Sequence, residues 1–330
     1  MPHLHEWRPA LRDTLPHLAL GAGPTAVRPV PELRDGPAEI WVKDESAFGD
    51  GGWGGNKVRK LEWLLPDVKA RGRRTILTFG ALGTNWGLAT ALYARDRGID
   101  TALALIDQPV DAHVARQLER LEGSGATLHF TRSKLRTIAA APWLVLRHSS
   151  GMRTPYVLPA GGSSPLGTLG YVETAMEIAA QVRAGEIPEP GHVVVPAGSG
   201  GTTAGLALGL GLAGLDAKVL GVAVTDALRL DRASMTRLAE RSAKLLRRRG
   251  AEFEAPALDL EMIEEFLGPG YGYPTPESTA ALERARAAGL DLEPVYTAKA
   301  MAALLARNAA AGLGERPVLF LNTNGPRPLS

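Results

Sequence analysis

Segments patterned like strands and segments patterned like helices alternate along most of this chain, and this alternation restricts the fold more than any other feature. The first series has strands at 74–79, 101–106 and 126–130 and helices at 86–97, 112–122 and 133–147. The second series has strands at 192–196, 218–224 and 317–322 and helices at 166–184, 203–213, 232–249, 276–288 and 298–311. Such alternation is typical of crossover units, so we predict an α/β protein with mainly parallel sheets flanked by helices.

The length of the chain predicts two lobes, because 330 residues exceed the size of one small domain. We predict a small α/β domain at 45–155, inserted into a large domain made of 1–44 and 156–330. The first 38 residues are proline-rich and are predicted to be irregular, up to a short strand at 40–43. Ligands of open α/β folds bind at the carboxyl ends of strands, so we expect the site in the cleft between the lobes.

Composition excludes several classes of function. The formal net charge is +2 with mixed signs, which gives no electrostatic basis for binding nucleic acid or an anionic membrane. The chain has no cysteine, and its seven histidines lack metal-site spacing, so neither a disulfide nor a metal site is expected. The N-terminus does not resemble a signal peptide, and no segment reaches the ~18 apolar residues of a membrane span. A cytoplasmic protein is expected.

Lys57 follows a glycine-rich segment and stands where a helix begins. Residues 49–55 contain five glycines, and the sequence continues as Asn56-Lys57-Val58. Glycine lets a backbone pass close to a ligand, and a lysine held there against an aromatic aldehyde is desolvated and able to form a Schiff base. The alternative is a flexible loop before an ordinary basic helix start.

A second glycine-rich loop follows a β-branched run at 193–195. It reads Gly198-Ser199-Gly200-Gly201-Thr202 and opens into a helix. Successive N–H groups in such a turn form a concave anion site, and the positive end of the helix dipole adds to it. The loop lacks the signature of a Walker A or a dinucleotide site. It predicts a phosphate cup, or else a tight turn without a ligand.

A Schiff-base lysine and a separate phosphate cup together suggest pyridoxal 5′-phosphate (PLP). The sequence resembles the fold-type II PLP enzymes, the tryptophan synthase β-like group, and within them the 1-aminocyclopropane-1-carboxylate (ACC) deaminases and D-cysteine desulfhydrases. The resemblance rests on blocks at 54–62, 159–171, 198–206, 268–276 and 293–301. It implies a two-lobed fold with the cofactor in the cleft between the lobes.

The resemblance also implies roles for individual residues. Lys57 would bind the cofactor and move the Cα proton, and Asn85 would contact the PLP phenolic oxygen. Thr84, an expected helix N-cap, is a further catalytic candidate. The implied cofactor-binding residues are Lys57, Asn85, Gly198, Ser199, Gly200, Gly201, Thr202 and Thr323. The implied substrate-binding residues are Thr84, Asn85, Trp86, Tyr271 and Tyr296, and the two tyrosines are also catalytic candidates.

Departures from the family pattern narrow the expected substrate. Thr297 stands where the deaminases carry a glutamate, Trp86 replaces a smaller polar residue, and Asn324 replaces a glycine. We therefore expect a PLP-dependent lyase that eliminates a β-substituent from a small amino acid such as D-cysteine, giving ammonia and a 2-oxo acid. The alternatives are an ACC deaminase or β-replacement enzyme, and a PLP- or phosphate-ligand-binding protein without turnover. The expected partners are the amino-acid substrate and a second copy of the chain in a homodimer.

Overall fold

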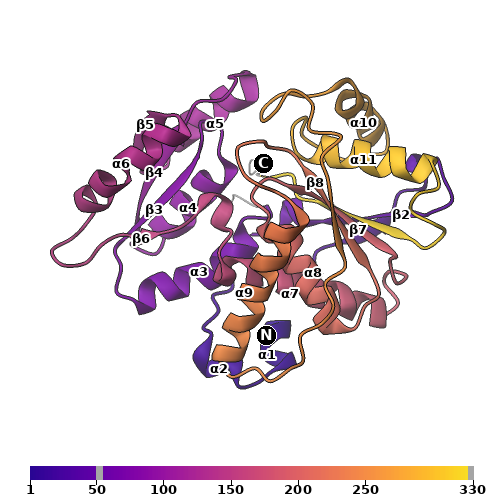
Figure 1. Cartoon of the computed structure of the whole chain (residues 1–330), viewed down its shortest axis with the longest axis horizontal. Coiled ribbons are helices and arrows are strands. Elements are labelled where there is room, and N and C mark those ends of the chain that lie inside the picture. Colours follow the sequence, from indigo (N-terminus) through magenta and orange to yellow (C-terminus); the bar gives the residue numbers. More distant parts are fainter. Residues whose placement is uncertain (50–54, 326–330) are drawn as a thin grey trace.

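The computed structural model describes residues 1–49 and 55–325, and its strands form two separate sheets. The strands of the four-stranded sheet come from residues 75–157, and those of the six-stranded sheet come from 27–44 and 192–322. Figure 1 shows the two sheets side by side, with the four-stranded sheet on the left. The predicted α/β class with mainly parallel sheets is confirmed, whereas the domain boundaries stay a prediction.

The six-stranded sheet has the order β1-β2-β10-β7-β8-β9, and only β1 runs antiparallel to its neighbour. Its strands are β1 (Val27–Pro29), β2 (Ile40–Asp44), β7 (His192–Ala197), β8 (Lys218–Ala223), β9 (Leu260–Ile263) and β10 (Val318–Asn322). Successive side chains of a strand point to opposite faces. Val194 therefore packs under α10 (Pro276–Ala287) and α11 (Thr297–Ala309), and Val193 packs against α7 (Pro165–Arg183) and α8 (Gly201–Ala213).

The four-stranded sheet is parallel throughout, in the order β5-β4-β3-β6. Its strands are β3 (Thr75–Ala81), β4 (Asp100–Ile106), β5 (Thr127–Arg132) and β6 (Tyr156–Val157). One face packs against α3 (Val58–Ala70), α4 (Asn85–Arg95) and α5 (Ala112–Gly123), and the other packs against α6 (Lys134–Arg147). In both sheets the parallel strands end at the edge where loops carry the predicted site residues.

The prediction that the first 38 residues are irregular was wrong in part. They contain the short helices α1 (His3–Trp7) and α2 (Leu11–Thr14) and the strand β1. The Glu173 carboxylate of α7 accepts hydrogen bonds from the backbone N–H groups of His3 and Leu4, at 2.5 and 2.9 Å, and so satisfies the start of α1. This partner lies about half the chain away, so local sequence could not reveal the helix.

Two further elements complete the fold. The strand β9 was not predicted, and it extends the large sheet by pairing with β8. Helix α9 (Arg232–Arg248) packs against α7 and α8 (Figure 1). Within 1–49 and 55–325, none of the helices combines the length and the apolar character that crossing a membrane requires.

Candidate active site

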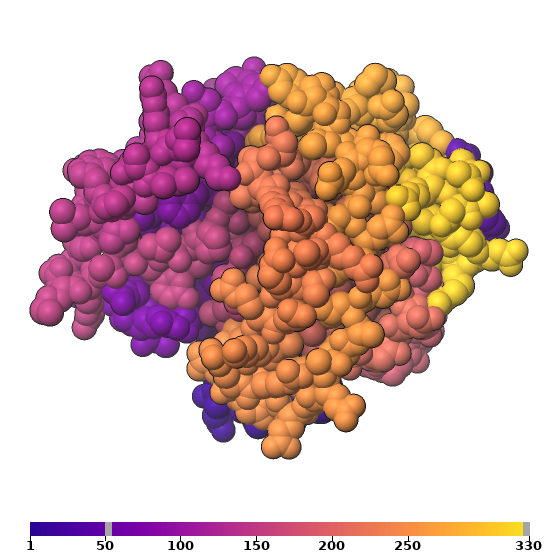
Figure 2. All heavy atoms as spheres, in the orientation of Figure 1, coloured from indigo at the N-terminus to yellow at the C-terminus, as the bar shows by residue number. Residues whose placement is uncertain are grey.

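A cavity of about 660 Å³ lies where the loops of the two sheets meet. Its lining comes from the carboxyl ends of β3, β7, β8 and β10 and from the start of α3, as the location of ligand sites in parallel α/β folds predicts. In Figure 2 the magenta and orange parts of the chain meet along a furrow. Lys134 of α6 joins its two sides by donating a hydrogen bond to the Ala227 carbonyl, at 3.2 Å.

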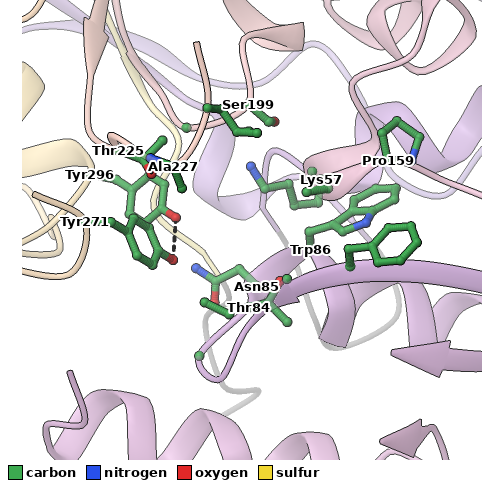
Figure 3. A pocket seen from close by; sticks show the side chains of 18 of the residues that line it. Lys57, Thr84, Asn85, Trp86, Pro159, Ser199, Thr225, Ala227, Tyr271 and Tyr296 are labelled. Carbon is green, nitrogen blue, oxygen red and sulfur yellow. Dashed lines mark hydrogen bonds between the residues drawn. The ribbon is translucent and has the colours of Figure 1, made fainter. Parts of the chain in front are cut away.

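Lys57 immediately precedes α3, and its side chain points into the cavity (Figure 3). Burial lowers the pKa of Lys57 to about 8, although the nearby Glu293 carboxylate acts in the opposite direction. An amine with this pKa is partly neutral near neutral pH and is therefore a nucleophile for a carbonyl. Residues 50–54 of the glycine-rich segment lie outside the described residues.

The predicted phosphate cup, residues 198–202, joins β7 to α8 and lines the cavity on the side of the large sheet. Gly200 has a φ of 81°, a left-handed conformation that turns the chain into the helix. In the described chain, the N–H groups of Ser199, Gly200 and Thr202 have no hydrogen-bond acceptor. Gly201 differs, because its N–H donates to Ser163 Oγ at 3.0 Å and it does not line the cavity.

Lys60 lies beside the cup and does not line the cavity, and sequence reasoning gave it no cofactor-binding role. Its side chain is buried, and its Nζ donates to the Gly161 carbonyl at 3.0 Å and to Ser163 Oγ at 3.4 Å. Ser163 Oγ in turn lies 2.8 Å from Ser199 Oγ of the cup. Burial and the charge of Lys57 lower the pKa of Lys60 well below its usual value. Among the described residues no carboxylate forms an ion pair with Lys60.

The loop after β3 places Thr84, Asn85 and Trp86 on the cavity. Thr84 is the N-cap of α4, as predicted, and its hydroxyl accepts the Gly87 N–H at 3.1 Å. The Asn85 side-chain oxygen accepts a hydrogen bond from Gln117 in α5, which orients its amide group.

The Trp86 indole is almost fully buried, with 2% of the residue exposed, and it donates to Thr78 Oγ1 at 2.8 Å. It lies in the wall of the cavity, beside Lys57 and Pro159 in Figure 3. Its hydrogen bond holds the ring toward β3. The tryptophan, which stands where the resembled family has a smaller residue, therefore thickens the wall of the cavity.

Tyr271 and Tyr296 face each other across the cavity from Lys57 (Figure 3). The Tyr296 hydroxyl donates to the Tyr271 oxygen at 2.8 Å, and the rings meet edge to face with centroids 5.9 Å apart. Burial raises the pKa of both phenols, and neighbouring Glu293 raises each further. The two hydroxyls therefore remain protonated at neutral pH and can act as hydrogen-bond donors.

Glu293 was not predicted as a site residue, although it lies in one of the blocks that carry the resemblance. Its carboxylate accepts the N–H groups of Val295 at 3.0 Å, Tyr296, and Thr297 at 2.7 Å, and it lines the cavity. The hydroxyl of Thr297 bonds the Glu293 backbone N–H at 2.8 Å and does not line the cavity. Thr323, after β10, does line it, as does Asn324.

These groups fit PLP. The free N–H groups of the cup suit a phosphate monoester, and the Lys60 amine beside them has no carboxylate partner among the described residues, so no protein anion competes with a phosphate there. The amine of Lys57 suits the aldehyde, and Asn85 and Thr323 supply polar groups for the ring. A volume of about 660 Å³ holds such a cofactor together with a small amino acid.

Comparison with known proteins agrees with this chemistry. Residues 18–324 match the family described as pyridoxal-phosphate dependent enzyme. D-cysteine desulfhydrases are similar along almost the whole chain: that of Klebsiella pneumoniae is 35% identical over 318 residues and that of Salmonella paratyphi A is 33% identical over 319, each with 94% of both chains covered. A crystal structure described as an ACC deaminase homologue superimposes with a TM-score of 0.82 at 31% identity, covering 98% of this chain and 95% of the other.

Proposed function

Because the chain belongs to the pyridoxal-phosphate dependent enzymes, and within them to the group of ACC deaminases and D-cysteine desulfhydrases, we propose that it is a lyase acting on a small D-amino acid such as D-cysteine. Its cofactor is pyridoxal 5′-phosphate. The observation that carries the proposal is the Lys57 amine, which has a lowered pKa and faces the Tyr271–Tyr296 pair across one cavity.

In the proposed reaction the Cα–H bond and the bond between Cβ and its substituent both break. The electron pair of the second bond leaves with the substituent, which is sulfide for D-cysteine. Water then replaces the nitrogen, giving ammonia and pyruvate. When bound, PLP stabilises the negative charge that develops at Cα. Lys57 Nζ is the group that takes the Cα proton, because it lies in the cavity and is partly neutral near pH 7.

Three other groups in and beside the cavity orient the reactants. The cup and Lys60 hold the phosphate, and the first turn of α4 presents N–H groups that suit the carboxylate of an amino acid. The tyrosine pair donates hydrogen bonds to the substrate and supplies a proton to the departing group, since both phenols stay protonated.

Position 297 supports elimination over cyclopropane ring opening. The deaminases resembled here have a glutamate at this position, whereas the Thr297 hydroxyl of this chain is engaged at the start of α11. If Thr323 faces the pyridine nitrogen of PLP, as the resemblance implies, its hydroxyl would not keep that nitrogen protonated as a carboxylate would. The ring would then be a weaker electron sink, which favours rapid loss of a good leaving group. The solved structure described as an ACC deaminase homologue keeps ring opening as the second candidate.

Steady-state release of 2-oxo acid from a substrate panel tests the proposal. We expect turnover of β-chloro-D-alanine and D-cysteine to pyruvate, and turnover of ACC to 2-oxobutyrate at least roughly a hundredfold slower, which a barrier difference of about 3 kcal/mol produces. The L-enantiomers serve as matched controls for chirality. Comparable efficiency on ACC would establish the deaminase alternative instead.

Two further outcomes distinguish the remaining alternatives. Product formation that requires an added thiol would indicate β-replacement. A protein that binds PLP, shown by visible absorbance, but releases no 2-oxo acid from any member of the panel would be a binding protein without turnover.

A further inference from the structure

Lys299 of α11 is fully buried, with 0% of the residue exposed, yet it is not one of the residues that line the cavity. Its Nζ donates to the Leu267 carbonyl at 2.6 Å and to the Gly270 carbonyl at 3.4 Å. Both acceptors are neutral, and within the described residues no carboxylate forms an ion pair with this ammonium. Burial accordingly lowers the pKa of Lys299, and the charges of Glu293 and Asp226 oppose that effect. Burying an ammonium without an anionic partner costs desolvation free energy, and the two carbonyl contacts of Lys299 offset part of that cost.

The carbonyls that Lys299 binds belong to the segment that carries Tyr271. Gly268, Gly270 and Gly272 have φ values of 66°, 133° and 88°, all in the region that favours glycine. Such a segment, which we call the tyrosine loop (residues 267–272), has many conformations open to it and needs contacts from elsewhere to select one.

Asp226 supplies a second contact to the tyrosine loop. Asp226 lies in the loop after β8, and its carboxylate accepts the Tyr271 N–H at 3.3 Å. The loop is therefore held by a cation from α11 and an anion from the loop after β8. The Gly270 carbonyl that Lys299 binds and the Tyr271 N–H that Asp226 accepts belong to one peptide group, directly before the Tyr271 side chain. The hydroxyl of that side chain meets Tyr296 in the cavity.

We propose that Lys299 is a positioning residue that holds the tyrosine loop so that the Tyr271 hydroxyl meets Tyr296 inside the cavity. Its amine binds no substrate and acts only through the loop. The catalytic consequence rests on the function proposed above, whereas the effect on the loop does not. A helix-borne ammonium is suited to this role because its three donors bind several carbonyls at once and because the helix itself is anchored in the core.

A double-mutant cycle separates positioning from general stabilisation. Lys299→Met removes the charge at similar length, and Tyr271→Phe removes the hydroxyl that the loop presents. Each single variant is expected to lower kcat about 10- to 100-fold, with a smaller change in KM. If Lys299 acts through Tyr271, the double variant is at most about threefold slower than Tyr271→Phe alone, since contacting residues are not additive. Multiplied losses would overturn the proposal.

Asn308 provides a matched control on the same helix. It is fully buried and also holds a loop, since it bonds the Ala38 carbonyl and the Ala38 N–H, each at 3.1 Å. Asn308→Ala is expected to lower the melting temperature with little change in kcat. In the double variant with Tyr271→Phe, its small effect on kcat is expected to multiply with that of Tyr271→Phe. Lys299→Arg, which keeps a cation with several donors, is expected to restore most of the lost kcat. An inactive, fully folded Lys299→Arg protein would contradict the proposal.

Hydrogen exchange tests the role of Lys299 without an assay of turnover. Its result is therefore informative even if the proposed reaction is wrong. In Lys299→Met the amides of the tyrosine loop are expected to exchange at least about tenfold faster than in the wild-type protein, both with and without PLP, while those of β7 are unchanged. Unchanged exchange in the loop, or equal acceleration throughout the chain, would refute a positioning role.

Discussion

Arg59 and Lys60 are adjacent residues in the first turn of α3, both buried, but they enter two regions with opposite electrostatic balance. Arg59 belongs to an ion network made of Lys43, Glu45, Arg59 and Glu177. Its guanidinium binds Glu45 at 3.0 Å and Glu177 at 2.8 Å. Lys43 binds Glu177 at 2.7 Å, so two cations meet two anions. Among the residues that the structure describes, Lys60 meets a carbonyl and a hydroxyl beside the cup and no carboxylate.

The pKa values of Arg59, Glu177 and Lys60 reflect this difference in electrostatic balance. Burial alone would lower the pKa of Arg59 and raise that of Glu177, but their mutual attraction and that of Glu45 and Lys43 reverse both directions, and the Glu177 pKa falls to about 2. Burial dominates at Lys60, whose pKa is lowered. The charge of Arg59 is balanced within the protein and is therefore structural, whereas Lys60 lies beside the free N–H groups of the cup without a carboxylate partner among the described residues, and we expect a ligand anion there.

The largest expected effect is the loss of the amine at the head of this helix. We expect Lys57→Ala to lower 2-oxo acid formation on the order of 10³- to 10⁴-fold, because it removes the group that we propose to move the Cα proton. Steady-state kinetics on the folded variant measure it. Borohydride reduction of the wild-type holoenzyme, followed by peptide mapping, should place the pyridoxyl group on Lys57. A label on Lys60 or Lys299 would reverse the assignment.

Breaking the ion network should lower the free energy of unfolding. Arg59→Met leaves Glu45 and Glu177 without their main partner and is expected to lower the free energy of unfolding by about 3–5 kcal/mol. Arg71→Met is the matched control at the C-cap of the same helix, because Arg71 is exposed and pairs with Asp67; we expect a loss below about 1 kcal/mol. Urea unfolding of the apo proteins measures both. Equal losses would remove the distinction between the two regions.

Substitution of Lys60 should change the affinity for PLP. Lys60→Met is expected to weaken PLP binding about 10- to 100-fold, the value of a charge-assisted hydrogen bond, while the apo protein is as stable as the wild type or more so. Absorbance titration of the apo protein gives the affinity, and urea unfolding gives the stability. If the apo variant instead lost several kcal/mol at unchanged affinity, Lys60 would be structural like Arg59.

The smallest expected effect is a shift in pH dependence. Burial lowers the pKa of Lys57 to about 8, so the neutral amine of the apo protein increases as the pH rises through this value. The Glu293 carboxylate favours the ammonium, and Glu293→Gln should therefore move the midpoint to lower pH. Competitive labelling with acetic anhydride, quantified on the Lys57 peptide, follows the titration. The exposed Glu119→Gln is the control, and a shift to higher pH in Glu293→Gln would contradict the proposed proximity.

Local patterns were enough to select some of the residues that line the cavity. Lys57 after its glycines and the cup from Gly198 to Thr202 were recognisable because turns and helix starts have short-range sequence requirements. Thr84 was predicted as an N-cap for the same reason. Lys60 stands three residues after Lys57, on the same side of a helix, and this spacing was the signal available for placing it near the cofactor.

Contacts between distant segments decided the rest. Tyr271 and Tyr296 were predicted separately, but their hydroxyl contact depends on how the tyrosine loop lies over α11. Trp86 was predicted to contact substrate, which stays a prediction, and its bond to Thr78 sets the ring into the cavity wall. Nothing in the pattern around Glu293 indicated that its carboxylate would bind three N–H groups at the start of a helix and face the cavity.

The sequence by itself determined the α/β class and the positions of the two glycine-rich loops, because strand and helix periodicity and turn chemistry act over a few residues. Only the tertiary structure decided which buried charges are balanced. Arg59 meets a carboxylate 118 residues away, and its neighbour Lys60 meets none among the described residues. Electrostatic free energy depends on distance and burial in space, and neither quantity can be read from positions along the chain.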